Sequence, residues 1–234
     1  MLEVCVDTVQ SAIDAARAGA QRIELCAALD VGGVTPSRSL IEAARSAVDV
    51  PMIVLIRPRS GDFQYDASER QQILSAADEA AQCGAQGLAV GALLADGQLD
   101  RSLLQQLRHA QPDIELVMHR AFDSCSNPTQ ALQQLVELGY DRILTSGGAA
   151  EVSSGCEALR QLRELAGELI EIIPGGGVTA HNAAQILRVT GCDQLHGSFR
   201  KPALPCPDSQ FGTKRHVDPL AIACVRQILD RAGS

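Results

Sequence analysis

The sequence predicts an α/β protein, a (β/α)8 TIM barrel that forms a single domain over residues 1–234. Short apolar runs alternate along the chain with amphipathic stretches of helical period, which is typical of parallel strands joined by helices. Eight such pairs in 234 residues give about 29 residues per unit, the size of this barrel. A doubly wound open sheet is the alternative, but no G-x-G-x-x-G motif follows the first strand. The predicted strands contain "LEVCV", "RIELC", "PMIVLI", "GLAVGAL", "ELVMH", "RILTS", "EIIPG" and "QLHGS".

Helix signals fall between these runs. Three stretches begin with a capping residue followed by proline, at Thr35-Pro36, Asn127-Pro128 and Asp218-Pro219. Residues 201–217 are rich in proline and polar side chains, and they predict a long loop before the last helix.

A repeated pattern fixes the faces of the even-numbered strands. The copies begin at Gly19, Gly84, Gly139 and Gly191, each expected just after a helix. Four residues later every copy is apolar, which predicts side chains packed against the helices: Ile23, Leu88, Ile143 and Leu195. Five and seven residues later the side chains should face the barrel interior, because strand side chains alternate. This interior set contains Glu24, Cys26, Ser146, His196 and Ser198.

Composition narrows the range of functions. The net charge is −8, from 28 acidic and 20 basic residues, which argues against nucleic-acid or anionic-membrane partners. No run of 18 apolar residues and no basic leader with an apolar stretch is present, so we expect neither a membrane span nor export. Eight cysteines without a C-x-x-C pair predict free thiols in the cytoplasm.

Ionisable residues of the first, second and eighth strands should meet inside the barrel. Glu3 lies on the first strand, and Glu24 and His196 lie on the strands that flank it. A buried carboxylate beside a histidine is a candidate acid–base catalyst. The alternative is a structural polar network.

The stretch "VMHRAFD" places three more ionisable groups, His119, Arg120 and Asp123, where a buried strand ends. His119 and Asp123 are further catalytic candidates, because barrel enzymes carry their chemistry at this end of the strands. Arginines and glycine turns at the same end predict an anion site. Its candidate residues are Arg57, Arg59, Arg120, Ser146, Gly175, Gly176, Gly177, Gly197 and Ser198. Surface ion pairing of the arginines and ordinary tight turns are the alternatives.

Several of these motifs together resemble the CutC copper-homeostasis family. The resembling stretches are "LEVC", "RIELCAALDVGGVTPS", "IRPRSGDFQY", "HRAFD" and "RILTSG", in order from Leu2 to about His196. The resemblance implies a (β/α)8 barrel, a cytoplasmic homodimer and a role in copper tolerance. It also implies a set of recurrent family residues at the mouth of the barrel, the end where the strands finish: Glu3, Glu24, Arg57, Arg59, His119, Arg120, Asp123, Ser146 and His196.

Two functions follow from the sequence. In the first, the protein binds Cu(I), which prefers thiolates, through Cys5 and Cys26, a pair that adjacent strands could bring together. In the second, it is an enzyme that acts on a small phosphorylated or carboxylate substrate by acid–base chemistry. Schiff-base chemistry is not expected, because Lys201 and Lys214 are the only lysines and neither falls on a strand.

Overall fold

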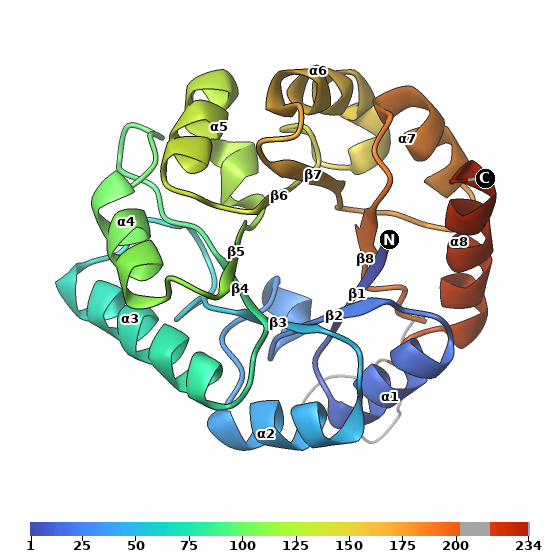
Figure 1. Cartoon of the computed structure of the whole chain (residues 1–234), viewed down its shortest axis with the longest axis horizontal. Coiled ribbons are helices and arrows are strands. Elements are labelled where there is room, and N and C mark those ends of the chain that lie inside the picture. The colour runs from blue at the N-terminus through green and yellow to red at the C-terminus, as the bar shows by residue number, and fades with distance from the viewer. Residues whose placement is uncertain (202–215, 234) are drawn as a thin grey trace, which may run out of the picture.

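The structure is a computed structural model that describes residues 1–201 and 216–233. Eight parallel strands surround the centre and eight helices form an outer ring, which confirms the predicted TIM barrel (Figure 1). The strands are β1 Leu2–Val6, β2 Arg22–Leu25, β3 Met52–Leu55, β4 Gly87–Val90, β5 Glu115–Met118, β6 Arg142–Thr145, β7 Glu171–Pro174 and β8 Leu195–Gly197. The helices are α1 Val9–Arg17, α2 Arg38–Ala47, α3 Ala67–Gln82, α4 Arg101–Ala110, α5 Pro128–Glu137, α6 Cys156–Ala166, α7 Ala183–Thr190 and α8 Pro219–Ala232.

The strands follow one another around the barrel in sequence order, except that β8 pairs with β1. The described residues show no backbone ladder between β7 and β8. At the N-terminal ends of these strands, the side-chain amide of Gln194 bridges the seam and donates to Glu171 over 2.7 Å.

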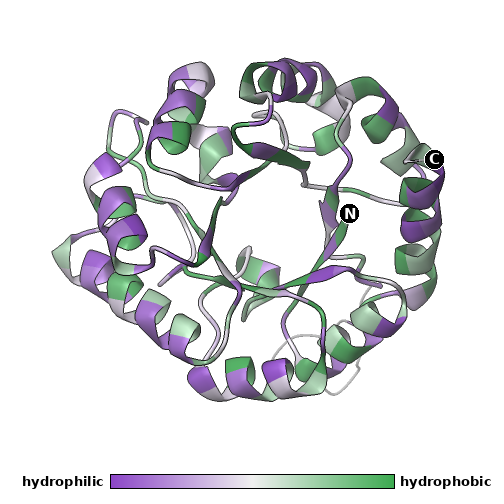
Figure 2. Ribbon diagram, viewed as in Figure 1, coloured by the Kyte–Doolittle hydropathy of each residue, from purple (hydrophilic) through white to green (hydrophobic). Residues whose placement is uncertain are grey.

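Two separate apolar cores hold the barrel. The larger core lies between the sheet and the helices and contains Ile23, Leu88, Ile143 and Leu195, as the repeat predicts. In Figure 2 the helices of the ring carry hydrophilic and hydrophobic residues side by side, as amphipathic helices with one face on a sheet do. The smaller core fills the barrel interior with Cys5, Cys26, Ile53, Leu55, Ala89, Val117, Leu144 and Ile173. The strand faces predicted from the glycine repeat are therefore confirmed.

The four repeat glycines follow α1, α3, α5 and α7 and have backbone φ angles of +68° to +104°. Glycine is favoured at such left-handed positions because it has no Cβ to clash with the backbone.

One predicted helix start is wrong. Asn127 and Asp218 cap α5 and α8 with proline at the next position, but α2 begins at Arg38 with Ser37 as its cap. The hydroxyl of Thr35 instead accepts the backbone N–H of Arg57 over 2.8 Å. Thr35 therefore holds the loop after β3 in place.

The predicted loop at 201–217 lies for the most part outside the described residues. Its described ends meet, since the Lys201 N–H donates to the His216 carbonyl over 2.9 Å. No helix within the described ranges is long and apolar enough to cross a membrane.

Candidate functional site

A cavity of about 260 Å3 opens at the C-terminal ends of the strands, and we call it the mouth cavity. Ten of the residues predicted from the sequence line it: Cys5, Glu24, Arg57, His119, Arg120, Gly176, Gly177, His196, Gly197 and Ser198. The other predicted residues, which do not line it, are Glu3, Cys26, Arg59, Asp123, Ser146 and Gly175.

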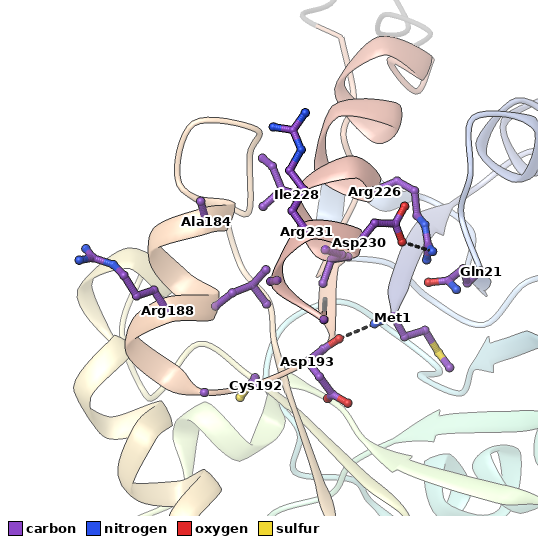
Figure 3. A pocket seen from close by; sticks show the side chains of 15 residues that line it. Met1, Gln21, Ala184, Arg188, Cys192, Asp193, Arg226, Ile228, Asp230 and Arg231 are labelled. Carbon is purple, nitrogen blue, oxygen red and sulfur yellow. Dashed lines mark hydrogen bonds and ion pairs between the residues drawn. The ribbon is translucent and has the colours of Figure 1, made fainter.

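A larger cavity of about 850 Å3 lies at the opposite end of the strands, beside α7 and α8 (Figure 3). The amino group of Met1 donates to the carbonyl of Asp193 there, and Arg226 pairs with Asp230. None of the predicted site residues lines this cavity. The chemistry expected from the sequence therefore belongs to the mouth cavity.

Glu3, His196 and Glu24 form a buried acid–base group, of which Glu24 and His196 line the mouth cavity. Nδ1 of His196 lies 2.7 Å from Oε1 of Glu3, and Arg22 pairs with the same carboxylate. Burial favours the neutral form of Glu3, but the hydrogen bond to His196 and the charge of Arg22 outweigh it and lower its pKa to about 2. Glu3 is therefore a fixed negative charge that holds His196.

Glu24 and His196 both have raised pKa values. Burial raises the pKa of Glu24, and the positive charge of His196 offsets only part of that effect. For His196, burial lowers the pKa. The negative charges of Glu24 and Glu3 and the hydrogen bond to Glu3 outweigh burial, so the net shift of the pKa is upward. Two neighbouring groups whose pKa values are both raised by their surroundings are candidates for acid–base work.

Two buried thiols lie beside Glu24. The sulfurs of Cys5 and Cys26 are 3.8 Å apart, because β1 and β2 are neighbours and the Cys26 N–H continues their ladder to the Val6 carbonyl. The Cys5 thiol donates to Oε1 of Glu24 over 3.1 Å. The hydrogen bond to Cys26, burial and the charge of Glu24 together raise the pKa of Cys5 well above its usual range.

These side chains form a candidate metal site. Ligand atoms of Cys5, Glu24 and His196 all lie within 4.8 Å of one another. With Cys26 behind Cys5, the set offers two sulfurs, an oxygen and a nitrogen. Sulfur donors of this kind select soft ions such as Cu(I) and Zn2+ over Mg2+ or Ca2+.

His119 is a neutral hydrogen-bond donor at the mouth. Its Nδ1 accepts the backbone N–H of Ala121 over 3.1 Å, so the single proton of the neutral ring lies on Nε2. Burial and the charge of Arg57 lower its pKa to about 3. Nε2 is buried and has no protein partner in the described part of the chain. His119 is therefore equipped to donate to a ligand rather than to act as a base.

Arg57 carries a positive charge that no carboxylate in the described residues pairs with. It is 7% exposed, and its guanidinium donates to the carbonyls of Gly32, Gly33 and Gly61. Its Cζ also lies 5.0 Å from the ring centroid of Phe63, which in turn packs on His119. The carbonyls and the ring fix the guanidinium in position without neutralising it, so its positive charge remains in the lining of the cavity.

The structure places Arg59 away from the cavity. Its guanidinium pairs with Glu69 over 2.5 Å and with Asp62 over 3.0 Å. Those two carboxylates compensate its charge, which is the surface ion pairing that the sequence left as an alternative.

Asp123 positions Arg120 and Ser146. Its carboxylate accepts a hydrogen bond from Nε of Arg120 over 2.8 Å. It also accepts hydrogen bonds from the hydroxyl of Thr145 and from the backbone N–H groups of Ser146 and Gly148. With its lone pairs engaged in this way, the carboxylate is not arranged to exchange protons with a ligand. Ser146, in the same group, accepts a hydrogen bond from Nη2 of Arg120 over 3.0 Å.

The glycine turn after β7 makes room for Arg120. Gly176 and Gly177 have φ angles of +96° and +86°, and a Cβ at Gly176 would lie 3.0 Å from Cζ of Arg120. Gly175 is a candidate for the anion site, which requires a backbone N–H that is free to bind the anion. The N–H of Gly175 instead donates to the Thr145 carbonyl over 3.0 Å.

The sequence reasoning missed a polar layer at the N-terminal ends of the strands, which we call the base layer: Arg22, Glu115, Arg142, Glu171 and Gln194. Arg22 donates to Gln194 over 3.0 Å, and Arg142 pairs with both Glu115 and Glu171. Arg22, Arg142 and Gln194 lie three residues after their repeat glycines. The same strand alternation, extended back by two residues, would have found these three.

Comparison with known proteins places the chain in a family. The sequence model of the CutC family matches residues 1–201. This chain belongs to the CutC family. A CutC family protein of Pasteurella multocida (strain Pm70) is 43% identical over 195 residues, which is 83% of this chain and 80% of that protein. The human copper homeostasis protein cutC homolog is 40% identical over 200 residues, 86% of this chain and 73% of that protein.

A solved CutC structure from Streptococcus agalactiae has the same fold. It superposes with a TM-score of 0.80 at 34% identity and covers 85% of this chain and 98% of the bacterial one. The family resemblance of the motifs is thus confirmed, and every residue that lines the mouth cavity lies inside the CutC match.

Proposed function

We propose that this protein acts in copper homeostasis by binding Cu(I) through Cys5 and Cys26. The observation that carries the proposal is the pair of buried sulfurs 3.8 Å apart at the bottom of the mouth cavity. The human relative is named as a copper homeostasis protein, which supports the same role here.

The donor chemistry fits Cu(I). Two thiolates at this separation can bind one soft ion between them after a small adjustment, and Glu24 and His196 stand beside the pair. This is the one group of three or more His, Cys, Asp or Glu side chains within the described ranges whose ligand atoms lie that close together. Copper is the cargo in this proposal rather than a catalytic cofactor.

Copper binding must release protons, because a thiolate rather than a thiol is the ligand. The raised pKa of Cys5 means that the free protein holds that proton at neutral pH. Glu24 is the acceptor of the thiol hydrogen bond and is placed to take the proton. Affinity for Cu(I) should therefore rise with pH.

The test is anaerobic competition between the reduced protein and a Cu(I) chelator. Wild type should bind one Cu(I), and Cys26→Ser should weaken binding at least ~100-fold because one of the two thiolates is lost. Cys83→Ser is the matched control, since Cys83 is also buried but caps the end of α3 far from the mouth. Undiminished affinity in the Cys26→Ser protein would rule out this ligand pair.

A second candidate function is acid–base catalysis on a small anion. The specific observation in its favour is that Arg57 faces the cavity without a carboxylate, next to the neutral donor His119 and above the Glu24–His196 pair. A phosphate or carboxylate held at Arg57 and Arg120 would lie above two groups that can move a proton. In this role Glu24 and His196 are the catalytic residues, while Glu3 and Asp123 hold His196 and Arg120.

Calorimetry with a panel of phosphate esters and dicarboxylates tests this candidate. Arg57→Gln should weaken binding by about 1.5–3 kcal/mol, the scale of a charged hydrogen bond. Arg59→Gln is the matched control, because its charge is compensated by Glu69 and Asp62, and it should bind like wild type. No binding across the panel, or an equal loss in both variants, would remove the support for the enzyme.

Family membership also supports a cytoplasmic homodimer. Light scattering on the purified protein and fractionation of cells that express it would test the two parts of this proposal separately.

A further inference from the structure

The two thiols differ in their access to the mouth. Cys5 lines the cavity, whereas Cys26 is fully buried and its sulfur lies 3.5 Å from the carbonyl of Val6. An ion that enters from the mouth therefore meets Cys5 first and reaches Cys26 afterwards.

The charges around the entrance do not suit a bare cation. Arg57 brings a positive charge that no described carboxylate pairs with. Arg120 lines the cavity over Gly176 as a second guanidinium, with its Nε paired to Asp123. Like charges in a narrow, partly apolar cavity repel, while an anion is attracted and concentrated there. In a reducing environment Cu(I) binds thiolates, and two thiolates on one Cu(I) give a complex with a net negative charge.

The cavity also has the size and lining for a small organic ligand. Its volume is about 260 Å3, and Phe63, Leu55 and Leu144 add apolar walls between the arginines and Cys5. That is close to the lower end of ordinary ligand pockets, roughly 300 Å3, so it admits a small thiol rather than a protein segment.

We propose that the mouth cavity receives Cu(I) as a complex with a small thiol that carries a carboxylate. Arg57 and Arg120 hold the carboxylate, and Nε2–H of His119 donates to the same ligand. The thiol end then lies toward Cys5. This inference rests on the proposed Cu(I) site and adds the class of donor from which the metal comes.

The transfer is a ligand exchange without oxidation or reduction. The sulfur of Cys5 forms a bond to Cu(I), the bond to one donor sulfur breaks, and the Cys5 proton passes by way of Glu24 to the departing thiolate. A second exchange at Cys26 releases the other donor thiol in the same way. One Cu(I) and two thiolates enter as a complex, and two thiols leave.

The experiment compares donors that differ in charge. Anaerobic quenched-flow would measure the initial rate of copper uptake from Cu(I)–mercaptosuccinate and Cu(I)–2-mercaptoethanol at equal free Cu(I). Wild type should take copper at least ~10-fold faster from mercaptosuccinate, the donor that carries carboxylates, which is the scale of electrostatic steering into a charged cleft. Succinate should slow uptake from mercaptosuccinate, because it competes for Arg57 and Arg120 in the cavity.

Variants locate the effect within the cavity. Arg120→Gln should bring the ratio of the two rates toward one, and Arg120→Lys, which keeps the charge, should restore most of it. Arg101→Gln is the control, because Arg101 is an exposed arginine of α4 that pairs with Glu137. The readout is a ratio within each protein, so a partial loss of folded protein does not affect it.

The outcomes separate this inference from the copper site itself. Equal rates from both donors in wild type, no effect of succinate, or an unchanged ratio in Arg120→Gln would each overturn the anionic donor while copper binding stood. Failure to take copper from either donor would instead overturn the copper site and this inference with it.

Discussion

The two ends of the barrel interior use charge in opposite ways. In the base layer each arginine faces a carboxylate: Arg22 pairs with Glu3, and Arg142 pairs with Glu115 and Glu171. At the mouth Arg57 is held by backbone carbonyls and the Phe63 ring rather than by a described carboxylate, and Nε2 of His119 has no partner in the described residues.

This difference separates structural from functional polarity. Charges that are paired compensate one another and leave little net charge for a ligand to bind. A charge or hydrogen-bond donor without a protein partner is costly to bury, and a ligand that supplies the missing partner can bind there. The base layer therefore stabilises the barrel, and the mouth is the place to look for binding and chemistry.

The largest expected effect is at the boundary between the two regions. Arg22→Met removes the guanidinium that pairs with the buried carboxylate of Glu3 and leaves His196 as its one remaining charged partner among the described residues. Removal of one partner of a buried pair costs about 3–5 kcal/mol. Urea unfolding should show that loss, while Cu(I) stoichiometry stays at one because Arg22 does not contact the thiols.

Two further proteins sharpen this comparison. Arg101→Met breaks the exposed pair with Glu137 and should cost about 1 kcal/mol or less. The double variant Arg22→Met/Glu3→Gln should recover part of the stability, because it removes the uncompensated charge as well. A loss in Arg22→Met no greater than in Arg101→Met would mean that the base layer is not a stabilising network.

Much of the fold could be predicted because its signals are local. The repeat glycines end helices, so counting from them gives the face of each following side chain, and Cys5 and Cys26 come together because β1 and β2 are neighbours. The start of α2 could not be read in this way. Thr35 has a capping side chain, but the loop after β3 uses its hydroxyl to hold the N–H of Arg57.

The partners of the charged site residues depend on contacts that the sequence does not display. Arg57 and Arg59 look equivalent in "RPRSGDF", yet Glu69 at the start of α3 reaches Arg59 alone. Asp123 looks like a catalytic carboxylate until the groups that donate to it are known. Residue types predicted where the site lies, and only the three-dimensional contacts assign a role to each side chain.

The smaller expected effect separates the two buried histidines of the mouth. His119 has a pKa lowered to about 3 by burial and by Arg57, whereas the carboxylates around His196 raise its pKa despite burial. Ring-nitrogen NMR over a pH series should therefore show a His119 that stays neutral through pH 5 and a His196 whose pKa lies above the usual 6.5. A His119 that titrates near the usual 6.5 would contradict the buried, neutral donor proposed here.

The same contrast predicts how stability depends on pH. Below about 6.5 the unfolded chain protonates His119 but the folded protein does not until about pH 3, so stability is lost as the pH falls through that window. From pH 7 to 5 this loss of stability amounts to about 2 kcal/mol, and His119→Gln should remove that part of the pH dependence.

Glu3, with a pKa lowered from 4.5 to about 2, affects stability mainly below this pH range. The contribution of His196 has the opposite sign, because its raised pKa gives stability that is fully present below pH 6.5 and lost as the pH rises. Urea unfolding at pH 7 and pH 5 for wild type and His119→Gln isolates the first effect, and parallel changes in the two proteins would show that His119 is not buried in its neutral form.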